Sequence, residues 1–474
     1  MSETPTATNE PAGPSAAETE PVRLTFDLDA DVCVVGAGLA GLTVALAAAQ
    51  RGASVAVLEG RRVGWNASGH QLGTVMPGYA LPLGDLIARV GFEDARELWT
   101  LSQQGVEAVR VTARAMDGIA LKDGVLEVSN VDTGDQLISR LQMLSEDFGT
   151  DVEGWQVERV RDTLRTRRYF HAVHYPNAFQ LDGRAYLRGL AALAHAAGAR
   201  IYEDTPAVDI DAAGIRKRIV TPQARLRASH VVLAGNVHLG EASRRLSETL
   251  LPVWRYAAIT APLGERLAEI VNFQGSVLDA AGIDHFRIVD GNRLMWASPE
   301  TTWAARPQRF AGAIRRRIRT IFPALGKVEI AETFAGATGQ TIHGMPQIGQ
   351  LRPGLWVASG FGRQGMNTSA VAGEIIASGI MSRDDRWRLF APFELVWAGG
   401  TTGRVAGHAI GLGTRFGSAA AGTLARYRER ALARETAREV RLAAANRQAW
   451  TGPSALQEEP ASQSRETAEG RESA

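Results

Sequence analysis

Cysteine is almost absent from the sequence. The only one among 474 residues is Cys33, and it lies inside an apolar run. A single thiol excludes a disulfide within the chain and a cysteine-rich metal site, and no other spacing of His, Asp or Glu resembles a metal site. This composition fits the reducing cytoplasm, so we expect a cytoplasmic protein that binds no metal.

Long hydrophobic runs and an excess of charge are also lacking. No stretch approaches the roughly 20 apolar residues that span a bilayer, and the N-terminus has no basic segment followed by an apolar one. The 52 basic and 51 acidic residues leave a formal charge of +1, which steers neither nucleic acid nor an anionic membrane toward the molecule. We therefore expect a soluble protein with no nucleic-acid partner and no membrane span.

Lysine is the third scarce residue type, and the chain has only Lys122, Lys217 and Lys327. Arginine supplies the other basic residues. A run of arginines within 315–319 suggests either an anionic partner or a solvated helix face. Ile314 and Ile318 mark the buried side of the same predicted helix, which favours the solvated face.

The sequence does contain a βαβ pattern near its N-terminus. Apolar runs at 31–36 and 54–59 predict two strands, and the small residues at 39–51 predict a helix between them. A second α/β region follows at 181–235. Alternating residues between 250 and 300, with a hairpin turn at Asp290-Gly291, predict an antiparallel sheet. We expect an α/β fold, α+β overall, with one sheet assembled from distant segments.

The turn after the first strand carries glycines in the G-x-G-x-x-G spacing, at Gly36, Gly38 and Gly41. The first permits a tight turn, the second lets the backbone approach a pyrophosphate, and the third lets the helix pack closely on the strand. The helix N-terminus offers unpaired N–H groups to negative charge. Glu59 ends the next strand and can accept hydrogen bonds from a ribose. The motif predicts a dinucleotide site, and the acidic residue at 59 leaves FAD or NAD.

Three further turns of small residues favour FAD over NAD. They are Ala67-Ser68-Gly69, Ala234-Gly235-Asn236 and the segment 360–366. An extended flavin dinucleotide reaches out of its Rossmann unit and needs such close backbone approaches elsewhere along the chain. We therefore expect FAD as the cofactor.

The ordered set of these segments resembles the FAD-dependent amine and amino-acid oxidases, the family that includes glycine oxidase, sarcosine oxidase and gamma-glutamylputrescine oxidase. The matching segments are 31–42, 58–59, 64–69, 187–190, 198–208, 231–236, 346–349 and 360–366. The resemblance covers residues 30–430. It is most similar to the gamma-glutamylputrescine oxidase branch, which shares the Ala-Gly-Asn turn and a long C-terminal extension.

The resemblance implies a set of residues that hold FAD. They are Gly36, Gly38, Gly41, Glu59, Ala67, Ser68, Gly69, Val208, Gly235, Gly360, Gly362, Gly365 and Met366. Val208 would lie by the adenine. The glycine loop from Gly360 to Met366 would lie at the pyrimidine edge of the isoalloxazine, where backbone N–H groups stabilise negative charge on the reduced ring.

The resemblance also implies a Rossmann-type FAD-binding domain interleaved with an antiparallel-sheet substrate domain. We place the FAD-binding domain at 29–100, 175–245 and 335–385, and the substrate domain at 101–174 and 246–334. A C-terminal helical extension follows at 386–450. The ends, 1–22 and 451–474, are rich in small and polar residues and are predicted to be disordered tails.

Three departures from the family bear on the chemistry. Members with covalent flavin use a cysteine before the Pro346 segment, and 334–345 contains none, so FAD is expected to be non-covalent. His70 offers either a histidyl link or a structural imidazole, and the structural reading is favoured. Related oxidases place a lysine over the flavin to help oxygen accept electrons, but no lysine lies between 250 and 300. Where relatives commonly have Thr-x-Asp, this chain has Thr341-Ile-His343.

The candidate catalytic residues are Arg287, His343 and Gln364. Hydride transfer from a neutral amine needs orientation more than an acid or a base. Relatives present an arginine toward the pocket at the place of Arg287, where it can hold a carboxylate; a solvent-facing arginine is the alternative. His343 either adjusts the amine, faces oxygen or is structural. Gln364 lies in the glycine loop and either orients the substrate or binds flavin oxygens.

Aromatic residues of the antiparallel region have two possible roles. Trp254, Tyr256 and Trp296 either form a wall around an ammonium group or belong to the core. The core is the more common place for such side chains.

The resemblance predicts oxidation of a small amine or amino acid at a C–N bond. Hydride passes to flavin N5, the imine hydrolyses and oxygen reoxidises the cofactor. One alternative is a dehydrogenase of the same fold that delivers electrons to a quinone or a protein acceptor. The other is a non-catalytic flavin-binding subunit of a complex. The sequence does not identify the amine.

Overall fold

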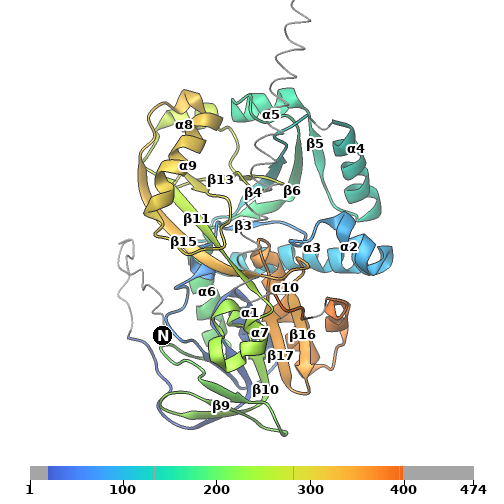
Figure 1. Ribbon diagram of the computed structural model, residues 1–474, viewed down its shortest axis with the longest axis vertical. Helices are drawn as coiled ribbons and strands as arrows, with labels where there is room; N and C mark the ends of the chain where they lie inside the picture. The colour runs from blue at the N-terminus through green and yellow to red at the C-terminus, as the bar shows by residue number, and fades with distance from the viewer. Residues whose placement is uncertain (1–19, 133, 281, 394, 399–474) are drawn as a thin grey trace, which may run out of the picture. The chain divides into compact units, whose positions relative to one another are not determined.

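The computed structural model describes residues 20–398 except 133, 281 and 394. These residues form two β-sheets with helices packed on them (Figure 1). The mixed α/β class and the βαβ unit near the N-terminus are therefore confirmed. None of the helices in these ranges is long and apolar enough to cross a membrane.

The first sheet joins segments that are far apart in the sequence, in the order β16-β17-β10-β1-β2-β7. The strands are β1 (Leu28–Val35), β2 (Val55–Leu58), β7 (Arg200–Tyr202), β10 (Arg225–Leu233), β16 (Gln347–Arg352) and β17 (Leu355–Ser359). All of these pair in parallel except β16, which is antiparallel to β17. Val32, Cys33 and Val34 have no exposed surface, which agrees with a parallel sheet covered on both faces. Two short strands, β8 (Asp209–Asp211) and β9 (Lys217–Val220), extend antiparallel from β10.

Helices with small residues cover this sheet. They are α1 (Leu39–Gln50), α3 (Phe92–Arg114), α6 (Gly183–Ala196) and α10 (Gly365–Met381). α1 contacts α6 and α10, and α3 contacts α10. A Cβ atom on Gly373 of α10 would lie 2.3 Å from Cγ2 of Thr43 on α1. The glycine therefore permits the close approach that holds α1 in place.

The second sheet has the order β15-β11-β14-β13-β12-β4-β6-β3, with β5 beside β6. The strands are β3 (Thr74–Val75), β4 (Lys122–Val128), β5 (Glu153–Trp155), β6 (Ala172–Gln180), β11 (Leu251–Thr260), β12 (Ser276–Asp279), β13 (His285–Val289), β14 (Arg293–Ala297) and β15 (Ile330–Gln340). Every pairing is antiparallel except that of β12 with β4. Asp290 and Gly291 both have positive φ, 50° and 75°, as the two-residue hairpin turn requires.

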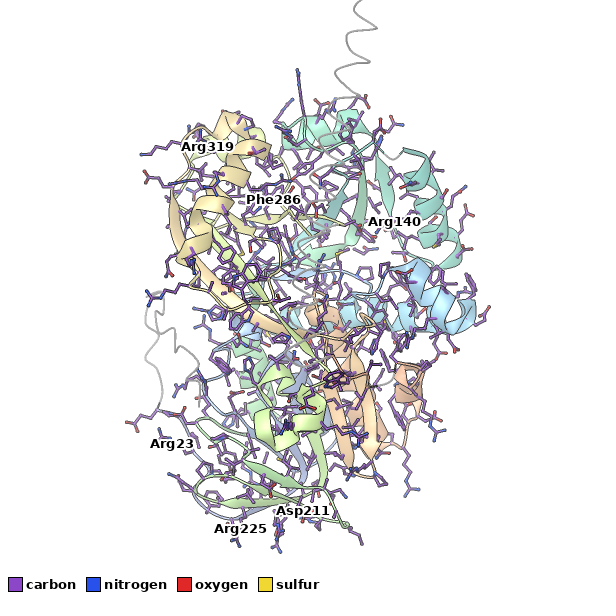
Figure 2. The ribbon with its side chains drawn as sticks, viewed as in Figure 1. Arg23, Arg140, Asp211, Arg225, Phe286 and Arg319 are labelled. Carbon is purple, nitrogen blue, oxygen red and sulfur yellow. The ribbon has the colours of Figure 1, made fainter. Side chains whose placement is uncertain are left out.

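One face of the second sheet forms an apolar core under α9 (Gln308–Ile321). Phe286, which is labelled in Figure 2, stacks on Trp296 with ring centroids 4.4 Å apart. Ile314 and Ile318 of α9 are buried in this core. Arg319 on the same helix is exposed, as are Arg315 and Arg316, so the predicted solvated basic face is confirmed. The remaining helices are α2 (Leu83–Val90), α4 (Gly134–Gln142), α5 (Val157–Leu164), α7 (Arg244–Ser247) and α8 (Glu265–Ile270).

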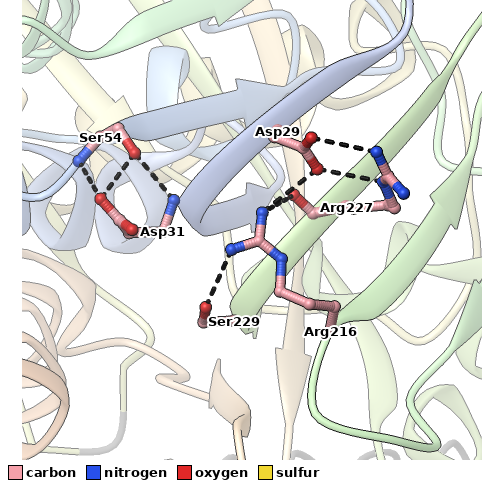
Figure 3. A network of polar contacts seen from close by, with 6 residues as sticks. All are labelled: Asp29, Asp31, Ser54, Arg216, Arg227 and Ser229. Carbon is pink, nitrogen blue, oxygen red and sulfur yellow. Dashed lines mark hydrogen bonds and ion pairs between the residues drawn. The ribbon is translucent and has the colours of Figure 1, made fainter.

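A polar network joins the beginning of β1 to its neighbours (Figure 3). Asp29 accepts hydrogen bonds from Arg227 at 3.1 Å and Arg216 at 3.2 Å, which lower the pKa of its carboxyl group. Asp31 accepts a hydrogen bond from the hydroxyl of Ser54 at 2.6 Å. Because these groups are largely exposed, their contribution to stability is small. The pairing of Asp29 with Arg227 shows how β1 is aligned with β10.

The two sheets divide the chain at points that differ from the predicted domain boundaries. The boundary at residue 175 lies inside β6, and all of β6 belongs to the second sheet. β3, from the predicted FAD-binding segment 29–100, also pairs in the second sheet. The chain makes this crossing where the Leu181 N–H donates to the Gly73 carbonyl at 2.9 Å. Most of the predicted extension 386–450 and the tail 451–474 lie outside the described residues, as does 1–19 of the other tail.

We expect Asp284→Ala to destabilise the protein by about 3–5 kcal/mol, the cost of breaking a buried ion pair. Asp284 has no exposed surface, and its carboxylate accepts two hydrogen bonds of 2.6 Å from Arg317 and one of 3.0 Å from the Tyr169 hydroxyl. Urea unfolding measures the change.

Asp162→Ala is the control. Asp162 is 79% exposed, and its ion pair with Arg165, at 3.5 Å, is longer than the bonds of Asp284. This substitution is expected to change stability by less than about 0.5 kcal/mol. Equal effects of the two substitutions would contradict the importance of the buried pair.

Candidate functional site

The turn between β1 and α1 is held by contacts that only glycine permits. Gly36 has a φ of 108°, and a Cβ there would lie 2.9 Å from the carbonyl carbon of Ala234. A Cβ on Gly41 would lie 1.9 Å from the carbonyl oxygen of Gly36. These contacts give the glycine spacing its physical reason, because α1 begins directly at the end of β1.

A cavity of about 350 Å³ opens at this turn. Its size falls in the range of roughly 300–1,000 Å³ typical of small-molecule and cofactor sites. Predicted residues that line it are Gly36, Gly38, Glu59, Ala67, Ser68 and Gly235. Residues that line it but were not assigned from the sequence include Arg61, Trp65, Asn66, Asn236 and His238. The cavity therefore brings together segments that lie far apart in the sequence, from residues 35–38 to Ala337.

Glu59 is buried at the floor of the cavity with 8% of its surface exposed. Its Oε2 accepts from the Ala37 N–H at 2.8 Å, and its Oε1 accepts from the Arg61 N–H and from Nε1 of Trp65. Burial raises the pKa of the carboxyl group, and these hydrogen bonds oppose the shift. A carboxylate has about four acceptor sites, so one remains for a ribose hydroxyl.

The cavity fits the diphosphate half of a dinucleotide. Gly38 begins α1 without a side-chain cap, and no acidic residue occupies the first turn, so the helix N-terminus can attract an anion. The Ser68 hydroxyl accepts from the Leu39 N–H at 3.1 Å and faces Gly38. Asn236 also lines the cavity, and its buried Oδ1 has no hydrogen-bond partner among the described residues. A Cβ on Gly339 of β15 would lie 2.0 Å from this oxygen, so the Asn236 side chain packs on that strand.

His238 and Trp65 form an aromatic side of the same cavity. Their ring centroids are 4.7 Å apart, and Arg61 lies over the Trp65 ring at 4.4 Å. Burial and the nearby Arg61 lower the pKa of His238 to about 4, so this imidazole is neutral at physiological pH. A ring and a guanidinium in this position suit a planar base.

The turn at Ala67–Gly69 connects the cavity to the second sheet. Asn66 exchanges hydrogen bonds with the backbone of Ala337 on β15, at 3.0 and 3.2 Å. The His70 ring stacks on Phe334 of the same strand, 5.9 Å between centroids, and its Nδ1 lies 3.1 Å from the Asn66 carbonyl. Burial, followed by Arg184, lowers the pKa of His70. These contacts support the structural reading of His70.

The glycine loop before α10 does not line the cavity. Gly360 and Gly362 have φ of 70° and 56°, and Phe361 forms a β-bridge with Gln340 on β15. Gly365 and Met366 begin α10, and Met366 is buried. The loop therefore meets β15 at Gln340, four residues along the strand from Gly336, which faces Ala67, and its flavin contacts stay a prediction.

Val208 is also outside the cavity. Its side chain is 48% exposed, and its N–H donates to the Val220 carbonyl at 2.8 Å. The neighbouring Pro206 and Ala207 line the cavity instead. The segment was predicted correctly to approach the site, but the structure does not bring Val208 itself to it.

Arg287 lies with other charged groups on the face of the second sheet opposite the α9 core. Phe286 and Ile288 face that core, so His285 and Arg287 project from the other face. Arg287 is 8% exposed, and its Nη1 donates to Oε1 of Gln180 at 3.0 Å. Burial lowers its pKa to about 10. The alternative of a solvent-facing arginine is therefore wrong.

Four further residues accompany it, namely Arg255, His285, Glu300 and Arg363. Nη1 of Arg255 lies 3.4 Å from Nδ1 of His285, and Arg255 and Arg363 both pair with Glu300, at 3.7 and 3.1 Å. We call Arg255, His285, Arg287, Glu300 and Arg363 the arginine cluster. Burial and the surrounding arginines hold the pKa of His285 well below its usual range. The sequence signal for His285 was its position two residues before Arg287 on the same strand, which places both side chains on one face.

The arginine cluster is continuous with the turn that lines the cavity. Leu72, three residues beyond Gly69, packs against Ala257, Met295 and Ala297 on the cluster's side of the sheet. None of the three lysines lies on this side of β11, β13 or β14, because Lys122 is on β4, Lys217 is on β9 and Lys327 lies outside the strands.

The other predicted catalytic residues, His343 and Gln364, are held by contacts within their own segments, and Gln364 directly follows Arg363 of the cluster. Nδ1 of His343 accepts from the Met345 N–H at 3.1 Å, and the ring lies against Phe393. Gln364 is the N-terminal cap position of α10, and its carbonyl accepts from the Thr368 N–H. Their catalytic roles stay predictions.

Two of the three aromatic residues, Tyr256 and Trp296, belong to the core. Tyr256 is fully buried and stacks on Phe310 with centroids 3.8 Å apart, and Trp296 lies in the α9 core. Trp254 pairs with Thr301 through backbone hydrogen bonds. The first two therefore lie on the opposite face from Arg287 and cannot line the same pocket.

Comparisons with known proteins agree with this geometry. The family model for FAD dependent oxidoreductase, DAO, matches residues 31–378. A probable oxidoreductase, OrdL, of Haemophilus influenzae is 28% identical over 76% of this chain and 85% of its own length. Gamma-glutamylputrescine oxidoreductase of Escherichia coli is 25% identical over 82% of this chain and 92% of its own.

A solved structure also shares the fold. The crystal structure of glycine oxidase from Geobacillus kaustophilus has a TM-score of 0.64 and 23% identity, and covers 78% of this chain and 99% of that one. The family match extends over both sheets and includes every predicted FAD residue. The chain therefore belongs to the DAO family of FAD-dependent oxidoreductases.

Proposed function

We propose that this FAD-dependent oxidoreductase oxidises a small amino acid or amine at a C–N bond, with oxygen as the electron acceptor. The observation that carries the proposal is Arg287, a guanidinium more than nine-tenths buried on the sheet face that continues from the dinucleotide cavity. A buried arginine is costly unless an anion balances it. The carboxylate of an amino acid is an anion that fits its planar fork.

When bound, FAD would supply the hydride acceptor for the carbon that bears the amine, and water would hydrolyse the imine product. The residues of this chain then have the task of orientation. Arg287 holds the carboxylate, and Gln180 fixes the guanidinium from one side. Gln364 and the N-terminus of α10 are assigned to the pyrimidine edge, and His343 to the edge of the substrate pocket.

Non-covalent binding of FAD is part of the proposal. Cys33 has no exposed surface within β1 and cannot reach a flavin ring. The contacts of His70 with Asn66 and Phe334 engage one nitrogen and the ring face. The single buried thiol also supports our assignment of the protein to the cytoplasm.

A dehydrogenase is the second candidate, because no lysine lies on the cluster's side of β11, β13 or β14. Positive charge near the reduced ring helps oxygen accept electrons. The guanidinium of Arg255 supplies positive charge on that face without a lysine, which supports the oxidase.

An anaerobic screen of amines and amino acids tests the reaction. We expect an amino acid to bleach the oxidised flavin absorbance, and we expect air to restore it with release of hydrogen peroxide. Recovery only after an artificial acceptor is added would identify the dehydrogenase. If no compound bleaches the flavin, amine oxidation is wrong and a non-catalytic flavin-binding subunit is favoured.

Gly41→Ala should weaken FAD binding about 5- to 150-fold. The added methyl group would meet the Gly36 carbonyl at 1.9 Å, and such overpacking costs roughly 1–3 kcal/mol. Flavin fluorescence during titration of the apoprotein measures the dissociation constant.

Gly84→Ala is the matched control, since a Cβ there meets no atom within 4 Å and the residue lies in α2. It should bind FAD like the parent protein. Equal affinity of both variants would contradict the role of the close contact at Gly41.

Arg287→Gln should raise KM for an amino-acid substrate about 10- to 100-fold, the effect of losing a hydrogen bond to a charged group. FAD content should not change, because Arg287 lies outside the dinucleotide cavity. Steady-state kinetics with Arg227→Gln as control, an exposed arginine on β10 of the first sheet, measure the effect. An unchanged KM would remove Arg287 from the substrate site.

A further inference from the structure

The arginine cluster carries more positive charge than one carboxylate balances. Three guanidinium groups, on Arg255, Arg287 and Arg363, accompany one carboxylate, Glu300. Arg255 donates to Nδ1 of His285, which leaves the proton of a neutral imidazole on Nε2, 2.8 Å from the Thr74 hydroxyl. His285 therefore adds no charge.

Other carboxylates near the cluster already have partners. Asp182 caps α6 by accepting from the N–H groups of Arg184 and Ala185. Asp290 is exposed and pairs with Arg293. Asp279 accepts from Asn130 and from the Ile283 N–H, and burial raises the pKa of its carboxyl group. Against the lowering by burial, Asp182 and Asp290 raise the pKa of Arg287, and Asp279 raises that of Arg255, through charge at a distance; among the described residues no ion pair joins them to these arginines.

Two guanidinium groups of the cluster also have hydrogen-bonding capacity left. The Nε atoms of Arg255 and Arg287 are buried, and neither has a hydrogen-bond partner among the described residues. Buried donors without partners are rare in folded proteins, and each one calls for an explanation. The two donors belong to arginines on different strands, β11 and β13.

The two arginines reach His285 from different strands. Arg287 is two residues further along β13 on the same face, and it is anchored by Gln180. Arg255 reaches His285 from β11, and β14 lies between these strands. The cluster is therefore an elongated charged surface, with the hydroxyl chain from His285 through Thr74 to Ser276 beside it.

We propose that the substrate carries two carboxylates, one bound by Arg287 and the other by Arg255, and is therefore a dicarboxylic amino acid or amine. This inference rests on the proposed function and names its substrate class. Arg287 holds the carboxylate next to the reacting carbon, as proposed above. Arg255, kept in place by His285 and Glu300, selects the second carboxylate.

Binding of non-reacting acids to the FAD-loaded protein tests the inference without turnover. Succinate and glutarate are the dicarboxylate probes, and butyrate is the monocarboxylate of similar length. Perturbation of the flavin absorbance reports binding. We expect the better dicarboxylate to bind at least about tenfold more tightly than butyrate, because it adds a second charge-assisted contact.

Arg255→Gln should remove this preference and leave the affinity for butyrate unchanged. Arg255→Lys keeps the charge and should retain part of the preference, whereas Arg227→Gln should retain all of it. Equal affinities of dicarboxylates and butyrate for the parent protein would overturn the inference, whatever the variants do. Equal loss of both ligands in a folded Arg255→Gln protein would also overturn it.

Failure of the inference can be distinguished from failure of the proposed function. If a monocarboxylic amino acid bleaches the flavin faster than aspartate, glutamate or an N-carboxymethyl amino acid, the function stands and the inference fails. If dicarboxylates bind tightly but no amine bleaches the flavin, the anion site stands and the function fails.

Discussion

The close approach of α1 to the end of β1 is the constraint on which the rest of the structure depends. Gly36 lies against the Ala234–Gly235 turn, and Gly41 lies against Gly36, at distances that leave no space for a Cβ. These two contacts join α1 to β1 and to the end of β10. The two strands come from distant parts of the chain. They place the helix N-terminus, the Glu59 carboxylate and Asn236 around one cavity.

The second sheet uses its two faces for opposite purposes. Phe286 and Trp296 stack in the core beneath α9, where apolar burial stabilises the sheet at roughly 25 cal/mol per Å². Arg287 and His285 occupy the other face of the same strand, where burial of charge is costly. A sheet so well anchored on one side can hold charged groups on the other at fixed positions. That arrangement supports selective binding of an anion.

The sequence predicted the dinucleotide site better than the substrate site, and the difference is physical. Glycine spacing and Glu59 act within one local βαβ unit, so their geometry follows from neighbours in the chain. The arginine cluster depends on the pairing of β11, β13 and β14 and on a loop that brings Glu300 to Arg255. Alternation in a single strand does not say which face meets the cofactor. For that reason Tyr256 and Trp296 were candidates for the pocket, although register places them in the core.

The passage of the chain between the two sheets also determines when each can form during synthesis. β1 pairs with β10, which ends at residue 233, and β10 pairs with β17, which ends at residue 359. The second sheet likewise contains strands from Thr74 to Gln340. Neither sheet can be completed while the first half of the chain alone has left the ribosome. Pairing over such separations is slow and leaves apolar strand edges exposed. A nascent chain of this protein therefore has to be kept from aggregation until its last strands emerge.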